Sequence, residues 1–355
     1  MRTSLGERLT EWLVAGVLWG IRIFIVAILV IGTFLTLTHN TYTKDQWIAF
    51  FIFGLSQGSI YAMIALGYTM VYGILRMINF AHGDIFMAGS FSAYFVADAL
   101  SRSGFLDAYP LVGLPIIVLF AMAISTLLAV IIERIAYRPL RNAPRLVPLI
   151  SAIGASFVLE YSFKGFFGAG VDAYPEVKVL SGEWQIFGIG ILKIQVVIAV
   201  VAILMMVLLY YIVMRTKIGK AMRAVSENKD VAALMGIDVN QIIVATFAIG
   251  AAMAGAAGVL YGLMFRQVNF FMGFFPGVKA FTAAVLGGIG NIPGAMLGGL
   301  VLGILESVGP ILFLNGLGIP RPYQLHDVLA FTVLVLILLF RPSGILGEAI
   351  TRKKA

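Results

Sequence analysis

The sequence predicts an all-α, polytopic membrane protein with a bundle of about ten transmembrane helices, and its composition and charge-free runs carry this prediction. Of the 355 residues, 61% are hydrophobic and 12% are charged, whereas a soluble domain has about 25% charged residues. Six stretches without Asp, Glu, Lys or Arg are longer than the roughly 20 residues that cross a bilayer as a helix. A soluble enzyme, a nucleic-acid-binding domain and a disordered chain are therefore disfavoured. A β-barrel is disfavoured too, because its strands would alternate apolar and polar residues.

Each predicted span corresponds to one apolar run. The ten spans lie near 18–38, 47–74, 85–100, 111–132, 146–166, 187–213, 242–264, 274–288, 293–313 and 327–340. Alternatives of eight or nine spans stay open, because 274–288 is short and contains Lys279 and because the first span could lie in the interface. The run 46–75 would be about 45 Å long as a helix, longer than the roughly 30 Å hydrocarbon core, so we expect it to tilt, kink or break.

Basic residues set the predicted orientation of the bundle. The loop 133–145 carries four arginines, the loop 215–241 carries five lysines or arginines, and the C-terminus is basic as well. Because basic loops of membrane proteins lie in the cytoplasm, both loops and both chain ends are predicted inside. This placement accounts for the net charge of +8 without nucleic acid.

Small residues recur at intervals of four in two predicted helices. The positions are Gly250, Ala254, Gly258 and Gly262 in one helix and Gly290, Gly294 and Gly298 in another. Such ridges let helix backbones approach closely. Bundle packing is the favoured interpretation, and a sliding surface for a conformational change is the alternative.

The second basic loop contains a short amphipathic helix. Ser226 is its predicted N-cap, acidic residues follow in the first turn, and Gly236 is its predicted stop. Val231, Leu234 and Met235 have the spacing of one helix face. Two interpretations stay open: this apolar face docks into a groove on a cytosolic partner, or the helix lies on the membrane surface.

Two carboxylates stand deepest in apolar sequence. Glu160 has Lys164 four residues later, the spacing of a helical ion pair, so we predict a structural pair. Glu306 has no cation within one turn. It either faces a pathway or pairs with another helix, and both possibilities stay open.

Several other kinds of chemistry are excluded. The chain has no cysteine and only three scattered histidines, so no metal site is predicted. A phosphate-binding loop of the form Gly-x4-Gly-Lys-Ser/Thr is absent from the sequence, so we expect no ATP to bind this chain. Gly54-Leu-Ser56-Gln-Gly58 has the spacing of a nucleophile elbow, but it lies in a hydrophobic helix, so Ser56 is predicted to pack.

Several longer motifs resemble those of the permease subunits of high-affinity branched-chain amino-acid ABC importers, and the LivH-type subunit in particular. They are Gly58–Asp84 (GSIYAMIALGYTMVYGILRMINFAHGD), Arg134–Arg141 (RIAYRPLR), Leu149–Gly154 (LISAIG), Lys279–Gly299 (KAFTAAVLGGIGNIPGAMLGG) and Arg341–Gly347 (RPSGILG). The resemblance covers about residues 47–348 in order. In the second basic loop, Asp230, Ala232 and Gly236 match the first, third and seventh places of the coupling pattern of ABC importers.

The resemblance implies three segments and a function. Residues 1–45 would be an N-terminal extension with an extra transmembrane helix, 46–348 the ABC-importer permease domain, and 349–355 a basic cytoplasmic tail. The chain would be a multi-pass protein of the bacterial inner membrane that forms the path for leucine, isoleucine and valine by alternating access, and it would not be an enzyme. A permease for urea or short amides is one alternative, and an ion-coupled secondary transporter is another.

The resemblance also implies partners and site residues. The partners are a homologous second permease subunit, two cytosolic ATPase subunits that hold the ATP, a periplasmic substrate-binding protein and the lipid bilayer; no cofactor would bind this chain. The implied ATPase-coupling residues are Glu227, Asn228, Asp230, Ala232, Leu234, Met235 and Gly236. The candidates for the pathway or its gate are Ser59, Tyr61, Asn79, His82, Gly83, Asp84 and Glu306.

The segment Asn79–Asp84 joins the second and third predicted spans, and Gly83 allows a turn there. One interpretation is a cytoplasmic gate or part of the ATPase contact. The other, which we favour, is an ordinary turn between helices in which Asp84 caps the next helix.

Overall fold

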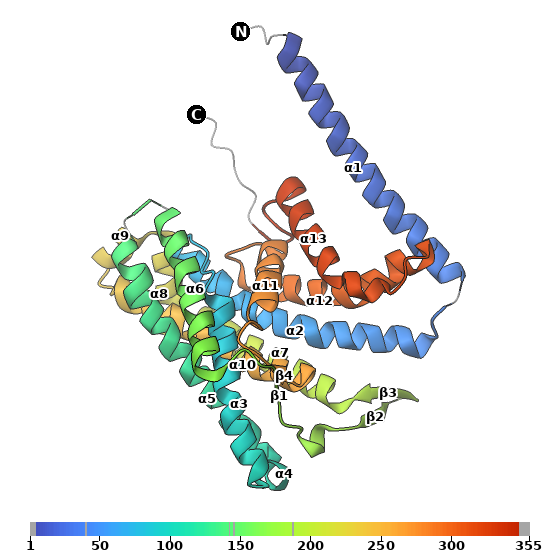
Figure 1. Ribbon diagram of the computed structural model, residues 1–355. Helices are drawn as coiled ribbons and strands as arrows, with labels where there is room; N and C mark the ends of the chain where they lie inside the picture. Colours follow the sequence, from blue (N-terminus) through green and yellow to red (C-terminus); the bar gives the residue numbers. More distant parts are fainter. Residues whose placement is uncertain (1–4, 40, 142, 145, 187, 348–355) are drawn as a thin grey trace.

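The computed structural model describes residues 5–39, 41–141, 143–144, 146–186 and 188–347, and it is a bundle of helices (Figure 1). The α-helices are α1 (Leu5–Thr38), α2 (Lys44–Leu75), α3 (His82–Arg102), α4 (Phe105–Ala108), α5 (Pro110–Ile132), α6 (Leu146–Phe167), α7 (Lys193–Arg215), α8 (Lys217–Glu227), α9 (Lys229–Leu234), α10 (Val239–Phe265), α11 (Phe274–Gly287), α12 (Ile292–Leu314) and α13 (His326–Phe340). A π-helical turn covers Glu133–Tyr137, and 3-10 turns cover Arg138–Leu140, Lys178–Leu180, Asn315–Leu317 and Pro322–Leu325.

Strands contribute little to the fold. They are β1 (Asp172–Ala173), β2 (Glu183–Ile186), β3 (Ile189–Leu192) and β4 (Gln267–Val268). β1 pairs with β4 and β2 with β3, each pair antiparallel. The β2–β3 hairpin corrects one predicted boundary: the span expected over 187–213 begins only at Lys193. Gly188 takes a left-handed backbone conformation (φ +82°) in the hairpin turn, so the chain reverses there instead of starting a helix.

All ten predicted spans contain a helix, but they are not equally suited to cross a membrane. Eight helices in the described part of the chain are long and apolar enough to do so. The two others are α3, whose 21 residues include acidic and basic side chains, and α11, which has 14 residues. The number of long apolar helices therefore equals the lower of the predicted alternatives, and the polytopic helical bundle is confirmed.

The long second helix does not break. α2 is continuous over 32 residues, about 48 Å, and every residue from 56 to 71 is buried. Its glycines serve close packing instead of a kink. A Cβ added at Gly54 would lie 2.9 Å from the carbonyl oxygen of Gly303, and one at Gly58 would lie 2.8 Å from that of Gly299. α2 and α12 therefore touch backbone to backbone.

The predicted ridge on α10 is also a packing surface. A Cβ at Gly250 would lie 3.2 Å from the Cα of Gly67 in α2, and one at Gly258 would lie 2.7 Å from the carbonyl oxygen of Phe86 in α3. The second ridge is confirmed only in part. Gly294 and Gly298 face the backbone of α11, whereas Gly290 precedes α12 in a turn with φ +96°.

The N-terminal helix α1 extends away from the rest of the bundle (Figure 1). It contacts α12 and the 3-10 turn that follows α12, and the backbone N–H of Gly316 donates to the hydroxyl of Thr36 at 2.8 Å. The predicted division at residues 45 and 46 stays a prediction, and the predicted basic tail, 349–355, lies outside the described residues.

Two helices begin inside the bundle. The first residue of α3, His82, packs against Gly67 of α2. Gly67 lies eight residues, or about 12 Å, before the end of α2 at Leu75, so α3 begins beside the interior of that helix. The start of α11 lies directly against the start of α3: a Cβ at Gly83 would lie 2.6 Å from the carbonyl oxygen of Gly273. Glycines are required at this contact because any side chain would separate the two helix starts.

Candidate functional site

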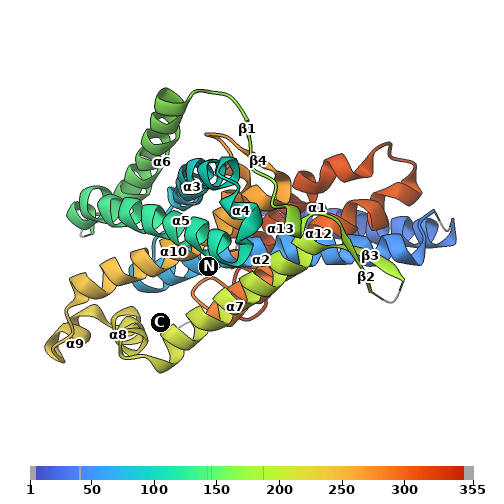
Figure 2. The same cartoon turned by 90° about the horizontal axis from the view of Figure 1, so that it is seen from below.

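A cavity of about 300 Å³ lies beside these two helix starts, between α3, α6 and α11. α6 forms its outer wall and lies at the periphery of the bundle (Figure 2). Aromatic side chains make up much of the lining: Tyr68, Phe80, Phe157, Phe271, Phe274 and Phe281. The rings of Phe271 and Phe274 stack with their centroids 5.2 Å apart, and those of Tyr68 and Phe281 meet edge to face at 6.1 Å.

Three polar side chains reach this mainly apolar cavity: Asp84, Ser156 and Glu160. Asp84 is 4% exposed and Glu160 is 6% exposed. The hydroxyl of Ser156 donates a hydrogen bond to Oδ2 of Asp84. Among the described residues, neither carboxylate has a cation within ion-pair distance.

Apart from Phe80, the Asn79–Asp84 segment is buried, and it contacts α2 and the π-helical turn after α5. The hydroxyl of Tyr137 donates to Oδ1 of Asn79 at 2.9 Å, and the ring of His82 lies 4.8 Å from that of Tyr68. The prediction that Asp84 caps the next helix is wrong. α3 already begins at His82, and its N-cap, Ala81, makes no side-chain cap. Asp84 lies in the first turn, so its carboxylate turns to α6 instead.

The ion pair expected between Glu160 and Lys164 is also absent from the described residues. The ammonium of Lys164 lies 5.2 Å from the centroid of the Phe270 ring and 5.5 Å from that of Tyr161. Helical spacing of four residues brings the two side chains to the same face, but the aromatic rings hold the Lys164 ammonium. The carboxylate of Glu160 therefore has no cationic partner among the described residues, and its side chain lines the cavity.

The other predicted pathway candidates, Ser59, Tyr61, Asn79, His82 and Glu306, do not line this cavity. Glu306 forms a buried ion pair with Lys279 of α11, which answers the question left open by the sequence in favour of pairing with another helix. Lys279 Nζ also lies 2.6 Å from Oδ1 of Asp327 and 5.8 Å from the ring centroid of Tyr61. Ser59 is fully buried and donates to the carbonyl oxygen of Leu55 in its own helix at 2.7 Å.

Carboxylates and an imidazole gather at this second cluster. Single ligand atoms of Glu306, His326 and Asp327 lie within 4.8 Å of one another. The ammonium of Lys279 already supplies a cation to both carboxylates.

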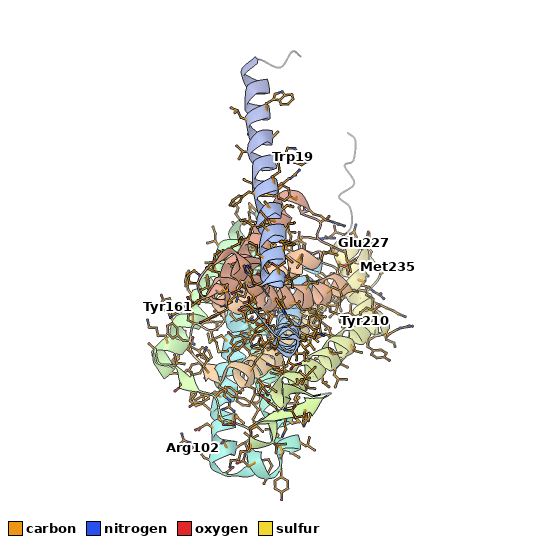
Figure 3. The ribbon with its side chains drawn as sticks, turned by 90° about the vertical axis from the view of Figure 1, so that its right-hand side faces the viewer. Trp19, Arg102, Tyr161, Tyr210, Glu227 and Met235 are labelled. Carbon is orange, nitrogen blue, oxygen red and sulfur yellow. The ribbon has the colours of Figure 1, made fainter. Side chains whose placement is uncertain are left out.

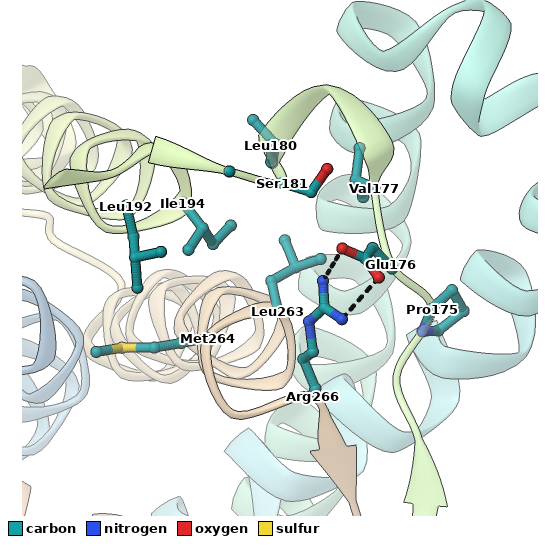
Figure 4. Close-up of a pocket in the computed structure, with 11 residues that line it drawn as sticks. Pro175, Glu176, Val177, Leu180, Ser181, Leu192, Ile194, Leu263, Met264 and Arg266 are labelled. Carbon is teal, nitrogen blue, oxygen red and sulfur yellow. Dashed lines mark hydrogen bonds and ion pairs between the residues drawn. The ribbon is translucent and has the colours of Figure 1, made fainter. Parts of the chain in front are cut away.

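A further cavity of about 230 Å³ lies at the end of α10, beside the β3 strand and the segment 175–182 (Figure 4). Its charged residues are paired, since Arg266 Nη2 lies 2.5 Å from Oε1 of Glu176. The hydrogen bond from Arg266 holds the pKa of Glu176 below its usual value. This cavity therefore contrasts with the first, in which the carboxylates lack a cation.

The predicted amphipathic helix exists as α9, but it begins two residues later than expected. Ser226 belongs to α8 and donates to the carbonyl oxygen of Arg223 at 2.7 Å. The N-cap is Asn228, whose Oδ1 accepts from the backbone N–H groups of Asp230 and Val231 at 3.0 Å each. Gly236 ends the helix in a left-handed conformation with φ +81°, as predicted.

The face expected to be apolar is open. Leu234 is 87% exposed, Met235 is 78% exposed and Val231 is exposed as well, whereas Ala232 is buried against the body. Figure 3 shows Glu227 and Met235 together at one edge of the molecule. All the implied coupling residues except Ala232 are therefore exposed within one segment, Glu227–Gly236, which we call the docking helix.

Sequence reasoning placed Gly83 and Asp84 in the pathway, and both line the cavity. It missed Ser156 and the aromatic lining, and it predicted a structural ion pair for Glu160, which lines the cavity. A signal for the lining was present in the sequence 270–275, which reads FFMGFF and is unusually rich in phenylalanine for a turn between helices.

A bundle of apolar helices, with two helix starts meeting beside a cavity that carries a few polar groups, is an arrangement typical of membrane transport proteins. The chain matches the family model described as branched-chain amino acid transport system / permease component over residues 50–338. It belongs to this family and is a multi-pass protein of the inner membrane.

Individual relatives support the same assignment. The chain is 46% identical over 298 residues to the high-affinity branched-chain amino acid transport system permease protein BraD of Pseudomonas aeruginosa, covering 83% of this chain and 94% of the relative. It is 43% identical over 300 residues to LivH of Escherichia coli K12, with the same coverage. It is also 28% identical over 309 residues to the probable permease LivM of Methanocaldococcus jannaschii, covering 80% of this chain and 83% of the relative. No solved structure matches it.

Proposed function

We propose that this chain is the membrane-embedded permease subunit of an ATP-driven ABC importer for branched-chain amino acids. The observation that carries the ATP-driven part is the docking helix, which presents Leu234 and Met235 to the surroundings. Two large apolar side chains so exposed on a polar, basic loop are best explained by a partner that covers them. The partner we infer is a cytosolic ATPase, and ATP binds there and not to this chain.

The substrate assignment rests on the relatives and on the cavity. BraD and LivH are both named as branched-chain amino acid permease proteins. The aromatic walls of the cavity suit an aliphatic side chain better than they suit urea. The chain itself carries the path, and its role in the importer is transport without catalysis.

The proposed assembly has two permease subunits, two ATPases and a periplasmic binding protein. This chain is similar to both LivH and LivM, and both are named as permease proteins of branched-chain amino acid transport. This similarity supports a pair of homologous permeases. The binding protein would deliver the amino acid to the side opposite the docking helix.

Movement would pass from the docking helix to the core through α8. α8 packs against α2, α7 and α10, and its Met222 and Val225 are buried in these contacts. ATP-driven closure of the ATPases would therefore displace α8 and, with it, the cytoplasmic end of α2. This is an alternating-access mechanism in which the cavity opens first to one side of the membrane and then to the other.

The ATPase contact is tested with Leu234→Asp. The substitution places a charge in the proposed apolar contact, so we expect the ATPases to be lost on co-purification while the chain still inserts into the membrane. Leu111→Asp is the matched control, because Leu111 is 89% exposed and lies at the start of α5, at the end of the molecule opposite α9 (Figure 1). Equal recovery of the ATPases with both variants would reject the docking assignment.

The transport activity is tested in proteoliposomes that contain both permeases and the ATPases. The binding protein and the labelled amino acid are added outside, and ATP is enclosed inside. We expect uptake of radiolabelled leucine, isoleucine and valine that depends on ATP and on the binding protein. Uptake by the purified chain without ATP would identify a secondary transporter instead, and preferential uptake of urea would reject the substrate assignment.

A further inference from the structure

The two carboxylates of the α3–α6–α11 cavity are unusual among the buried acids of this protein. Glu133 is fully buried and pairs with Arg138 and Arg141, and Glu306 pairs with Lys279. Asp84 and Glu160 are nearly as buried, yet within the described part of the chain they have no cationic partner.

Their unpaired oxygens reach the cavity. Asp84 uses Oδ2 to accept from Ser156, and no other side chain among the described residues donates to it. The carboxylate of Glu160 accepts no hydrogen bond from the described residues. Both side chains line the cavity. Those of their oxygens that lack a hydrogen-bond partner keep some accessible surface. A buried carboxylate without a cation is unfavourable in an apolar bundle. A positively charged ligand group in the cavity would remove this cost.

The rest of the cavity matches the remainder of a branched-chain amino acid. Its volume of about 300 Å³ is at the small end of ligand pockets, which begin near 300 Å³. The side chains of Phe271, Phe274 and Phe281 provide an apolar surface for an aliphatic chain, and aromatic rings can also attract an ammonium group. α3 and α11 both begin here, and the partial positive charge of helix starts suits the α-carboxylate.

We propose that this cavity is a substrate-binding site of the permease, in which Asp84 and Glu160 bind the α-ammonium group of the amino acid and the phenylalanine rings hold its aliphatic side chain. Ser156 acts as a positioning residue that fixes the carboxylate of Asp84. The proposal rests on the proposed function, because it takes the transported molecule to be an α-amino acid.

Protection from chemical modification tests the site directly. The complete importer, reconstituted in proteoliposomes, is treated with a hydrophobic carbodiimide, which modifies buried carboxyl groups, and the modified peptides are quantified by mass spectrometry. We expect leucine to slow modification of Asp84 and Glu160 by at least about fivefold. 4-Methylpentanoate, which is leucine without its amino group, should not protect them. Asp98, which is on the same helix as Asp84 but pairs with Arg102 near the surface, is the internal control.

The outcomes separate the two proposals. If the wild-type importer takes up no leucine, the proposed function is rejected, and with it the basis of this site. If it takes up leucine but leucine does not protect the two carboxylates, or 4-methylpentanoate protects them equally, only the site is rejected.

Substitutions provide a second measurement. Asp84→Asn and Glu160→Gln keep the side-chain size but remove the charge, and we expect each to lower ATP-dependent leucine uptake at least about tenfold while ATP hydrolysis persists. Asp84→Glu keeps the carboxylate and should retain uptake within about threefold of wild type, and Asp98→Asn should leave uptake unchanged. Wild-type uptake by both Asp84→Asn and Glu160→Gln would overturn the proposal. Loss of ATPase co-purification in these variants would assign the residues to folding, which also contradicts it.

Discussion

The buried ion pair between Lys279 and Glu306 makes a quantitative prediction about stability. Lys279 lies in α11 and Glu306 in α12, and their side chains are 6% and 1% exposed. Lys279→Met keeps an unbranched side chain of nearly the same length but removes its charge. Glu306 would then be a buried anion without a partner, and Asp327 would lose a contact of 2.6 Å. Breaking a buried pair from one side costs about 3–5 kcal/mol, which corresponds to roughly a 100- to 4,000-fold change in the folding equilibrium.

The assay is reversible unfolding in mixed micelles with increasing SDS, followed by tryptophan fluorescence and circular dichroism. Lys178→Met is the matched control. It removes the same group from a pair with Asp107 in which Lys178 is 78% exposed, and it should leave the unfolding midpoint unchanged because surface pairs contribute little.

The double variant Lys279→Met with Glu306→Leu sharpens this test. Replacing both members of a buried pair by apolar side chains is often neutral, so the double variant should recover most of the lost stability. The reasoning is refuted if Lys279→Met unfolds at the same SDS concentration as wild type. It is refuted as well if the double variant loses more stability than the two single variants lose when their losses are added.

Two further predictions concern backbone packing and helix capping. Gly58→Ala should destabilise the protein by about 1–3 kcal/mol, because the new Cβ would lie 2.8 Å from the carbonyl oxygen of Gly299; Gly73→Ala, which meets nothing within 4 Å, should be neutral or stabilising in the same SDS titration, and equal effects would contradict the α2–α12 contact. Asn228→Ala removes the cap of α9, worth about 1 kcal/mol, so the ATPases should bind about fivefold more weakly in a pull-down titration. Asn228→Asp retains an oxygen cap and should bind normally, and normal binding by Asn228→Ala would show that helical order in α9 is not needed for docking.

Helix positions were predictable because an apolar run longer than a bilayer leaves few alternatives to a helix. The start of α7 was not, because the apolar sequence 187–192 satisfies a strand hairpin as well as a helix. The cap of α9 was predicted on the wrong residue for a related reason. Ser226 and Asn228 are both good N-caps, and the choice depends on α8 continuing through Glu227.

Pairing between side chains was less predictable than the helices that carry them. The i, i+4 spacing of Glu160 and Lys164 permits an ion pair, but the ring of Phe270, more than 100 residues away, competes for the same ammonium. Lys279, the partner of Glu306, lies on another helix, which no local pattern reveals. The cavity could not be predicted because it depends on three segments that meet only in the folded chain.

The close contact between α2 and α12 limits how this protein can move. Added atoms at Gly299 and Gly303 would overlap Ala62 and Gly58 of α2, so the two backbones interlock along several turns. One helix could slide past the other only if its ridges were lifted over those of its neighbour, and this separation would expose the packed surfaces of both helices. α2 and α12 are therefore expected to rotate as a single rigid strut. Relative movement is then expected between this strut and the helices packed around it, and not between α2 and α12 themselves.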